Sequence, residues 1–455
     1  MEFRRNTRAP MSQIYVFGNS FASIVAVSEL AKGKKEFLWI QDGLNVDGIW
    51  RGINHKNRIL DLGMINFEFD VRHPNSSADL DTYSQYEIND CARFSDSVLN
   101  YVRRYSDVKV LPKILIYENN AIHHDHLLSN DFSHLDRFRD LAFDGTENPI
   151  GMHPSRKYTS NGKELLLDIS YGEYVKKYFG LEIADKLFLP WAHKLIGDNV
   201  ENTNTFRHRA AWLPLPYPET IFEAISGNLT DDYAYSFHYP IKDTFSEFVN
   251  QIFEGLNGDQ GIEILQSSDL SDQELKTILN SDSKVFWGSK LEVFLRIFDQ
   301  YPKHEIREFR NLINVDLYEV QSGNDFSSYV FLNNDSTDTA WYRLTVLPNV
   351  ELEDGLQIAI VESRGPKNPS LDSDHFSHLR IKIKTHIKSV QGVPVFLTLN
   401  GEQYRNYESW HKLLVDNFPS INFGGGASFA YSTTFSDQVI QGIRFARKEC
   451  EDVIG

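Results

Sequence analysis

The stretch from Gln13 to Gly52 constrains the fold of this 455-residue chain more than any other. It begins with a short apolar run, 14–17, of the kind that forms a parallel strand buried on both faces. Gly18 ends this run, apolar side chains then recur at helical spacing over 21–30, and 37–40 is a second apolar run. This order predicts a strand, a helix and a parallel strand, with a turn at Gly18 whose backbone N–H groups suit a pyrophosphate.

The turn differs from the dinucleotide-binding fingerprint, which has three glycines and an acidic residue after the second strand. Gly18 matches the first glycine, but Ser20 and Ser23 replace the other two, and Gln41 replaces the acidic residue. A serine hinders the approach of phosphate to the backbone without preventing it, and a glutamine amide can still bind a ribose hydroxyl. The pattern is consistent with a dinucleotide site and equally with a strand–helix–strand unit that binds no ligand.

The composition narrows the class of protein. A net charge of -17 argues against a nucleic-acid partner. The two cysteines form no C-x-x-C pair, which fits a reducing cytoplasm. No run approaches the roughly 18 apolar residues of a membrane span, and residues 1–10 lack the apolar core of a secretory signal, so they are left out of the fold prediction. We therefore expect a cytoplasmic protein of two or three domains.

The rest of the chain predicts a helical domain and a sheet domain. Helical patterns joined by polar linkers dominate residues 75–200, whereas alternating short strands separated by turns dominate 307–399. Apolar runs at 261–265 and 284–288 are expected to return to the first sheet, so the nucleotide-binding domain is discontinuous. The expected divisions are 11–75, 236–290 and 413–455 for the nucleotide-binding domain, 76–203 for the inserted helical domain, 204–235 for an extended segment that begins the sheet domain, and 291–412 for the antiparallel sheet domain.

A histidine-rich segment interrupts the predicted helical domain. His123, His124 and His126 surround Asp125 in what the sequence predicts to be a polar loop. They lack the i, i+4 spacing of a helical metal site, so no metal is expected there.

A second glycine-bearing turn lies near the C-terminus. Gly424, Gly425 and Gly426 follow an apolar run, and Ser436 or Asp437 is expected to begin a helix. A helix N-terminus beside glycines can bind an anion, although three consecutive glycines can also form a flexible loop.

Taken in order, these segments resemble the UDP-galactopyranose mutase branch of the FAD-dependent amine-oxidase-like superfamily, from Gln13 to about Arg447. The segments that carry the resemblance, besides the two glycine turns, are 187–197, 207–209, 239–241, 308–312, 341–344 and 437–440. The resemblance implies an α/β fold of three parts. These are a discontinuous Rossmann-like FAD-binding domain, an inserted helical domain and an antiparallel sheet over the active site.

The resemblance also implies an activity and the residues that serve it. Mutases of this kind use reduced FAD to contract the ring of a nucleotide sugar without net redox change, in surface polysaccharide or glycoconjugate synthesis. The residues expected to bind the substrate diphosphate are Arg310 and either Arg207 or Arg209, with Tyr431 as a hydrogen-bond partner to it and Arg343 as a further candidate. The residues expected to bind FAD are Gly18, Ser20, Phe21, Ser23, Gln41, Gly48, Trp50, Asp61, Gly63, Gly424, Gly425, Gly426, Ser436, Asp437, Gln438 and Val439.

Two other interpretations remain open at this point. One is an FAD-dependent oxidoreductase of the same superfamily that acts on an amine, a sugar or a tailoring substrate. The other is a relative whose cofactor site has decayed, leaving a binding role or a reaction without flavin. Ile65 and Asn66 stand where the mutases carry a histidine close to the flavin. The sequence is also compatible with a homo-oligomer.

Overall fold

A five-stranded parallel sheet forms one half of the protein in the computed structural model. The strand order is β10, β2, β1, β11, β17. The strands are β1 (Ile14–Phe17), β2 (Phe37–Gln41), β10 (Glu263–Gln266), β11 (Lys284–Trp287) and β17 (Ile421–Phe423). The structure describes residues 13–63, 67–69, 79–85, 94–142, 144–145, 160–208, 212–230, 234, 236–298, 310–323, 329–335, 341–352, 355–364, 371, 373–428 and 434–451. The α/β fold and the two returning strands predicted from the sequence are confirmed.

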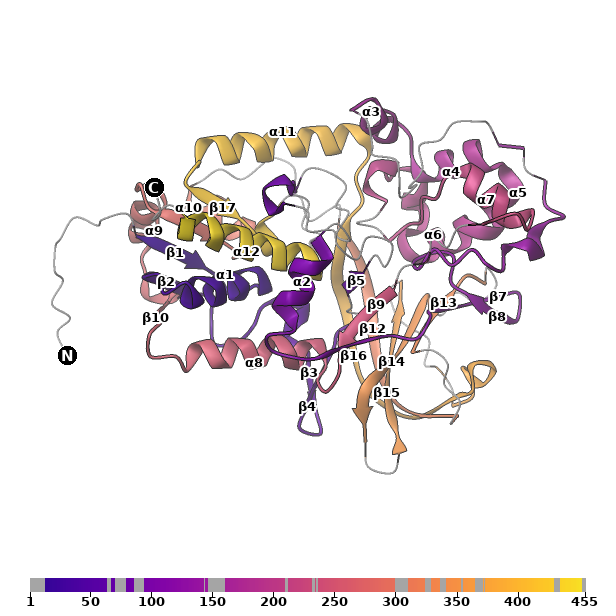
Figure 1. Ribbon diagram of the computed structural model, residues 1–455, viewed down its shortest axis with the longest axis horizontal. Coiled ribbons are helices and arrows are strands. Elements are labelled where there is room, and N and C mark those ends of the chain that lie inside the picture. The colour runs from indigo at the N-terminus through magenta and orange to yellow at the C-terminus, as the bar shows by residue number, and fades with distance from the viewer. Residues whose placement is uncertain are drawn as a thin grey trace.

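Helices cover both faces of this sheet because its strands are apolar on both sides (Figure 1). Ile14 and Val16 belong to the core on one face, and Tyr15 and Phe17 belong to the core on the other. The helices of the first face are α1 (Phe21–Lys32), α8 (Phe245–Asn257) and α12 (Phe435–Glu451). Those of the second are α9 (Asp272–Leu279), α10 (Leu291–Ile297) and α11 (Gly401–Asn417). Helix α10 and the first part of α11, up to residue 412, pack here although the range 291–412 is expected to form the sheet domain.

A seven-stranded sheet in the order β16, β12, β15, β14, β13, β7, β8 forms the second half. Its pairs are antiparallel except for β13 and β7, which run parallel. Strands β7 and β8 come from the range expected to be mainly helical, and β8 contains His123 and His124, so the predicted polar loop is wrong for these two residues. The strands are β7 (Leu115–Glu118), β8 (Ala121–His124), β12 (Arg310–Ser322), β13 (Val330–Asn333), β14 (Arg343–Glu351), β15 (Gln357–Ser363) and β16 (Ile381–Leu397).

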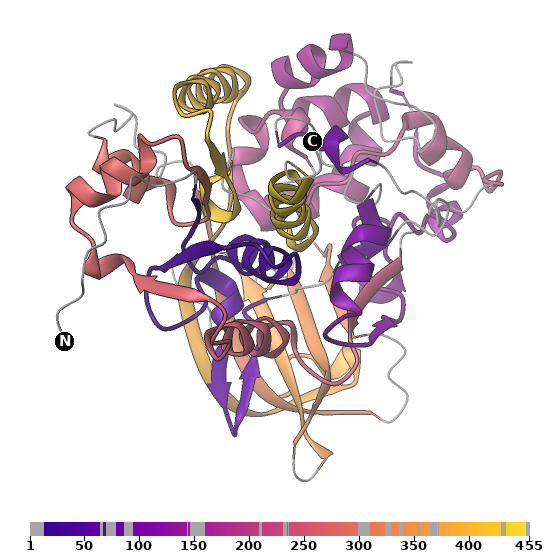
Figure 2. The same cartoon turned by 60° about the vertical axis from the view of Figure 1, so that its left-hand side comes forward.

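A cluster of short helices lies beside this sheet (Figure 2). Ser170 caps one of them through a reciprocal bond with Glu173, and Gly180, with a φ of 87°, ends it. A π-helical stretch, Ala184–Phe188, joins the next two helices. The members are α3 (Ser160–Asp168), α4 (Tyr171–Phe179), α5 (Leu181–Ile183), α6 (Leu189–Ile196) and α7 (Pro218–Ile225).

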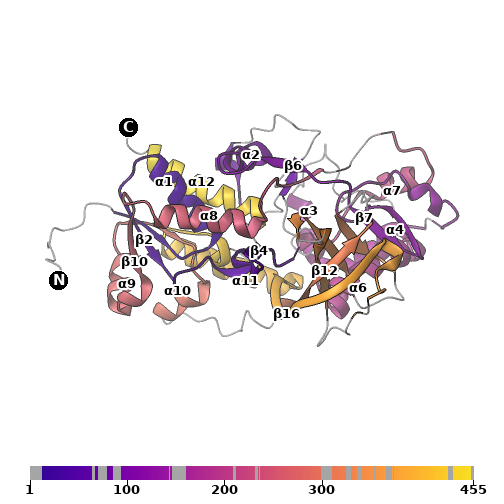
Figure 3. The ribbon, with the colours of Figure 1, turned by 90° about the horizontal axis from the view of Figure 1, so that it is seen from below.

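Smaller elements connect the two halves. Helix α2 and the three-stranded sheet β5, β9, β6 lie between the parallel sheet and the helical cluster (Figure 3). The elements are β3 (Ile53–His55) and β4 (Arg58–Leu60), which form a hairpin, α2 (Ser95–Val102), β5 (Phe67–Phe69), β6 (Val108–Val110) and β9 (Ser236–Pro240). Among the described residues, no helix is long and apolar enough to cross a membrane.

The contact between α1 and α12 gives a test of this architecture. A Cβ added to Gly442 would lie 2.7 Å from Val25 Cβ and 2.8 Å from the Ala22 carbonyl oxygen. We expect Gly442→Ala to lower the free energy of unfolding by about 1–3 kcal/mol through overpacking. Gly255 in α8 is the matched control, since no atom would lie within 4 Å of its Cβ. Gly255→Ala should stabilise by about 0.4–1 kcal/mol. Urea unfolding measures both, and equal effects would contradict the packing.

Candidate functional site

The first glycine turn joins β1 to α1. Gly18 has a φ of 87°, and a Cβ there would lie 2.6 Å from the Ser289 backbone nitrogen, so only glycine fits. Its N–H donates to the Ile40 carbonyl oxygen at 2.8 Å, and its own carbonyl accepts from Trp39 Nε1 at 3.0 Å. The turn is therefore tied to the neighbouring strand β2 on one side and to the residues after β11 on the other.

The two serines of the fingerprint are matched by glycines elsewhere in the chain. Ser23 Oγ donates to the Phe17 carbonyl at 2.9 Å, and a Cβ on Gly288 would overlap this hydroxyl. Ser20 is the N-cap of α1, and a Cβ on Gly425 would lie 2.6 Å from its Oγ. In the fingerprint, glycines in the first turn leave the room for close packing. Here Ser23 and Ser20 stand in that turn, and Gly288 and Gly425, which face them, leave the room instead.

The second glycine turn lies against the first. The N–H of Gly424 donates to the Trp287 carbonyl at 2.9 Å, and the N–H of Gly425 donates to Gln441 Oε1 at 2.9 Å. Gln438 reaches the start of α1, where its Oε1 accepts from the Ala22 N–H at 3.3 Å. Gly426, by contrast, is exposed. The turns after β1 and after β17, which are far apart in the sequence, therefore meet at the carboxyl ends of the parallel strands.

The start of α12 is capped differently from the prediction. The helix begins at Phe435, and Thr434 caps it: Thr434 Oγ1 accepts from the Asp437 N–H at 3.1 Å, and Asp437 Oδ2 accepts from the Thr434 N–H at 2.9 Å. Neither Ser436 nor Asp437 is the first capping residue. Asp437 is instead the acidic partner of the cap, and its Oδ1 accepts from the Tyr83 hydroxyl at 3.2 Å.

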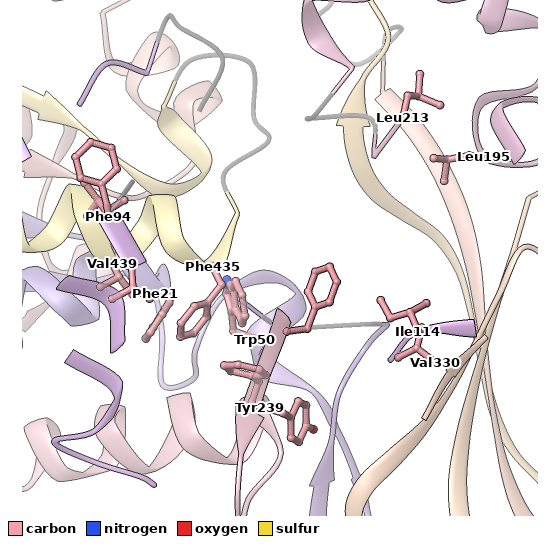
Figure 4. Close-up of a cluster of buried hydrophobic side chains, with 14 of the residues drawn as sticks. Phe21, Trp50, Phe94, Ile114, Leu195, Leu213, Tyr239, Val330, Phe435 and Val439 are labelled. Carbon is pink, nitrogen blue, oxygen red and sulfur yellow. The ribbon is translucent and has the colours of Figure 1, made fainter. Parts of the chain in front are cut away.

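Aromatic rings surround the start of α1 (Figure 4). Phe21 stacks on Phe435 with ring centroids 4.9 Å apart, and Trp50 packs edge-on to Phe435 at 5.7 Å. Phe245 adds a further ring, 4.7 Å from Phe435. Val439 is fully buried next to this group. Gly48, at the start of the 3-10 helix Gly48–Arg51 that carries Trp50, is exposed. Phe21 and Trp50 are thus core residues of this half of the protein.

Gln41, at the end of β2, stands at the position of the ribose-binding acid. It is 2 % exposed. Its Nε2 donates to Asn257 Oδ1 at 2.5 Å, and its Oε1 accepts from Gln266 Nε2 at 3.0 Å. Both ends of the amide already have partners, so a ribose hydroxyl would have to replace one of them.

Asp61 holds helix α8 onto β4. The carboxylate is fully buried and accepts from the Tyr239 hydroxyl at 2.6 Å and from the Ser246 N–H at 2.7 Å. Burial raises the pKa of Asp61 to about 6, although these hydrogen bonds oppose the shift. Two residues on, Gly63 has a φ of 101°, and its backbone approaches Glu362 so closely that a Cβ would overlap the carboxylate. The predicted Asp-x-Gly turn therefore contacts the seven-stranded sheet.

Arg343 lies buried beside that turn. It forms an ion pair with Glu362, its side chain is 1 % exposed, and its guanidinium carbon lies 4.1 Å over the Trp212 ring. Arg343 Nη1 is buried without a hydrogen-bond partner. The Arg364 guanidinium lies directly over Gly197, the turn that follows α6. These side chains form a charged group between the two halves, in which Arg343 has one donor to spare for an anion.

The other predicted diphosphate ligands are only partly described. Arg209 and Tyr431 lie outside the described residues. Arg207 ends a 3-10 helix and Arg310 begins β12, but the side chains of both lie outside the described part. Their roles stay predictions.

The residues at the first turn fit the phosphate end of FAD. The N–H groups of Ala22 and Ser23, in the first turn of α1, are each met by a side-chain oxygen, from Gln438 and Ser20. Acceptor atoms thus already stand where phosphate oxygens bind at a helix N-terminus, and a phosphate would have to replace the Gln438 amide. Asn19 Oδ1 is buried nearby without a partner. Asp42 follows Gln41 directly, and its carboxylate interacts with the Ser289 and Ser267 side chains, so an acidic group does lie beside the turn.

Solved structures with a similar fold cover nearly the whole chain. The crystal structure of a reduced UDP-galactopyranose mutase superposes with a TM-score of 0.65 at 14 % identity, over 96 % of this chain and 95 % of that one. A putative protoporphyrinogen oxidase from an Exiguobacterium species gives 0.56 at 12 % identity, over 98 % and 100 %. A putrescine oxidase variant with redesigned cofactor binding gives 0.50 at 11 % identity, over 97 % and 98 %. No family model and no curated protein matches the sequence.

The chain has the overall fold of these three structures. The predicted resemblance is confirmed at this level, because the match covers nearly the whole chain. At these identities the likeness concerns the fold, and the reaction has to be argued from the site.

Several residues of the site escaped the sequence analysis. Gly288 and Ser289 follow β11 directly, and the rule that parallel strands share one ligand-binding edge could have placed them beside Gly18. Glu362 and Trp212 gave no such signal, since a single acid in an alternating strand or a tryptophan before a proline is ordinary in a core.

The buried Asp61 makes stability depend on pH. The pKa of Asp61 is about 6 in the folded protein, compared with the ordinary value of 3.8 that applies to the unfolded chain. The folded state therefore binds the proton more tightly than the unfolded state does. Its contribution to stability is full below about pH 4 and is lost as the pH rises through about 6. We expect Asp61→Asn to reduce this loss, measured by urea unfolding from pH 4 to 7. Asp136→Asn, at an exposed position, is the control, and an unchanged slope in Asp61→Asn would contradict the assignment.

Proposed function

We propose that the protein is an FAD-dependent enzyme of the mutase type, which rearranges the sugar ring of a nucleotide sugar. The observation that supports this most is the contact between Ser20 and Gly425, which joins the two glycine turns at one edge of the parallel sheet. A cytoplasmic role in surface polysaccharide or glycoconjugate synthesis, in a homo-oligomer or alone, is part of the proposal. The solved structures that share its fold include a mutase, a putative protoporphyrinogen oxidase and a putrescine oxidase.

The residues proposed to hold FAD are those of the two turns. The N-terminus of α1 would bind the pyrophosphate after Gln438 moves aside, and Gln41 would bind a ribose hydroxyl through its amide. The Gly63 backbone would line the approach to the ring system. When bound and reduced, FAD supplies a nucleophilic nitrogen to the anomeric carbon.

The protein's own task in such a reaction is to hold the diphosphate leaving group. Arg343 keeps one N–H unpartnered in a buried site, where a charge-assisted hydrogen bond is stronger than in water. The Trp212 ring fixes the plane of the guanidinium. Arg310 is the further candidate from the same sheet. Together they would orient the nucleotide and stabilise the charge that develops on it.

An FAD-dependent oxidoreductase is the second candidate, and one observation favours it. Glu362 already pairs with Arg343, so this pair offers no net positive charge to a diphosphate. A neutral or cationic substrate such as an amine would meet less electrostatic penalty there than in a mutase with unpaired arginines.

The absorption spectrum of freshly purified protein tests the cofactor. We expect a flavin spectrum and release of one FAD per chain on denaturation. A colourless protein that takes up no FAD would contradict both the mutase and the oxidoreductase proposal. With FAD bound, turnover of a nucleotide sugar only after dithionite reduction, with no net electron consumption, supports the mutase. Oxygen consumption with peroxide release supports the oxidoreductase instead.

Substitution of the arginines tests the substrate class. We expect Arg310→Ala and Arg343→Lys to weaken UDP binding by roughly 10–100-fold, because each removes a directed donor to a phosphate oxygen. Isothermal titration calorimetry with UDP on the flavin-loaded protein measures this. Arg139→Ala is the control, since that side chain is 63 % exposed and pairs with Asp136. Binding that is the same in all three variants would refute the diphosphate role.

A further inference from the structure

A separate cluster of polar side chains lies at the edge of the seven-stranded sheet, in the half of the molecule that does not contain the parallel sheet (Figure 1). Strands β7 and β8 form a hairpin there, and the following loop leads into the 3-10 helix Leu135–Phe138. This arrangement brings together Glu118, His126 and His134, each of which offers one ligand-type atom within 4.8 Å of the others.

Asp125 shapes the loop that carries His126. Its buried carboxylate accepts from the N–H groups of Leu127, at 2.7 Å, and Ser129, at 2.7 Å. Asp131 fixes the far end of the loop through the His124 ring, 2.9 Å from its Oδ2. The loop is therefore held in one conformation by its own side chains, and the three ligand-type atoms are pre-positioned.

A neighbouring residue orients the His126 ring and the Glu118 carboxylate, in each case by a hydrogen bond to the polar atom that does not face the cluster. His126 Nε2 lies 3.3 Å from the Leu187 carbonyl and donates to it, so Nδ1 carries the lone pair. Asn334 Nδ2 donates to Glu118 Oε2 at 3.0 Å. Such outer partners are the usual means by which a protein aims a metal ligand.

The inward-facing histidine nitrogens have no hydrogen bonds. His126 Nδ1 and both ring nitrogens of His134 are buried without a hydrogen-bond partner, whereas Glu118 Oε1 is met by the Arg137 guanidinium in an ion pair. A buried nitrogen left without a partner destabilises the protein. A ligand that accepts electron pairs from all three would satisfy the cluster, and a metal cation does so.

Arg137 already contacts the cluster. Its guanidinium forms an ion pair with Glu118, but its Nε and Nη2 make no hydrogen bond. Its side chain is 22 % exposed. Arg137 therefore balances the charge of the carboxylate and leaves the two imidazoles unsatisfied.

We propose that Glu118, His126 and His134 bind one transition-metal ion of the Zn²⁺ class, which displaces Arg137 toward solvent. Two imidazole nitrogens and one carboxylate oxygen are a ligand set that Zn²⁺ uses, and a fourth position stays open to water. The ion would tie the β7–β8 hairpin to the 3-10 helix that follows it. This site is independent of the flavin proposal, because none of its residues belongs to the glycine turns or to the Arg343 group.

Zinc titration of the full chain, after dialysis against a chelator, tests the site. We expect one ion per chain by elemental analysis. His126→Gln and His134→Gln should each weaken binding by roughly 100-fold or more, and Asn334→Ala by roughly 10–100-fold. His386→Gln is the control, since that ring contacts Ser389 on β16. The wild-type protein loaded with Co²⁺ should show the visible bands of a four-coordinate site.

Arg137→Gln separates a metal site from a plain buried ion pair. Under the proposal it raises zinc affinity several-fold, because a competing cation is removed. If the cluster is only an ion pair, Arg137→Gln lowers thermal stability and the protein still binds no zinc, which overturns the proposal. Zinc binding that survives both histidine substitutions overturns it as well. Should the histidine variants misfold, the Arg137→Gln affinity and the wild-type Co²⁺ spectrum decide the question.

Discussion

The close contact between the two glycine turns is the constraint on which the parallel-sheet half depends. Ser20 and Ser23 place hydroxyl groups where the dinucleotide fingerprint has none, and Gly425 and Gly288 leave room for them. A side chain on either glycine would collide with the serine hydroxyl that faces it, at the start of α1. The same contact brings Gln438 over the first turn of α1, so the geometry of the proposed phosphate site and the integrity of the core rest on one set of atoms.

Buried charges connect the halves of the protein. Asp61 receives donors from β9 and α8, while the Glu362 carboxylate, paired with Arg343, lies against Gly63 two residues further on. An acid and an ion pair in adjacent positions make the junction specific, because a shift of one half would leave a buried charge without its partner. The junction is also where a substrate bound near Arg343 would meet a flavin bound near Gly63.

Local patterns allowed much of the fold to be predicted. The apolar runs of β1 and β2 and the alternating strands from β12 to β15 carry their signal within a few residues. Side-chain contacts between distant segments could not be predicted. The contact between Ser23 and Gly288 depends on the strand order. The approach of His134 to Glu118 depends on the β7–β8 hairpin, which was not predicted because its histidines suggested a polar loop. Thr434 was missed as a cap because Ser436 and Asp437 are equally good capping residues.

The position of α12 in the chain has a consequence for biosynthesis. Helix α1 leaves the ribosome long before α12, yet its apolar face packs against α12, whose Phe435 stacks on Phe21. Strand β17 likewise completes the sheet only from Ile421. Contacts that span so much sequence close slowly, and the surfaces that await them stay exposed meanwhile. A nascent chain that stalls before α12 emerges therefore leaves exposed the part of α1 that packs against α12.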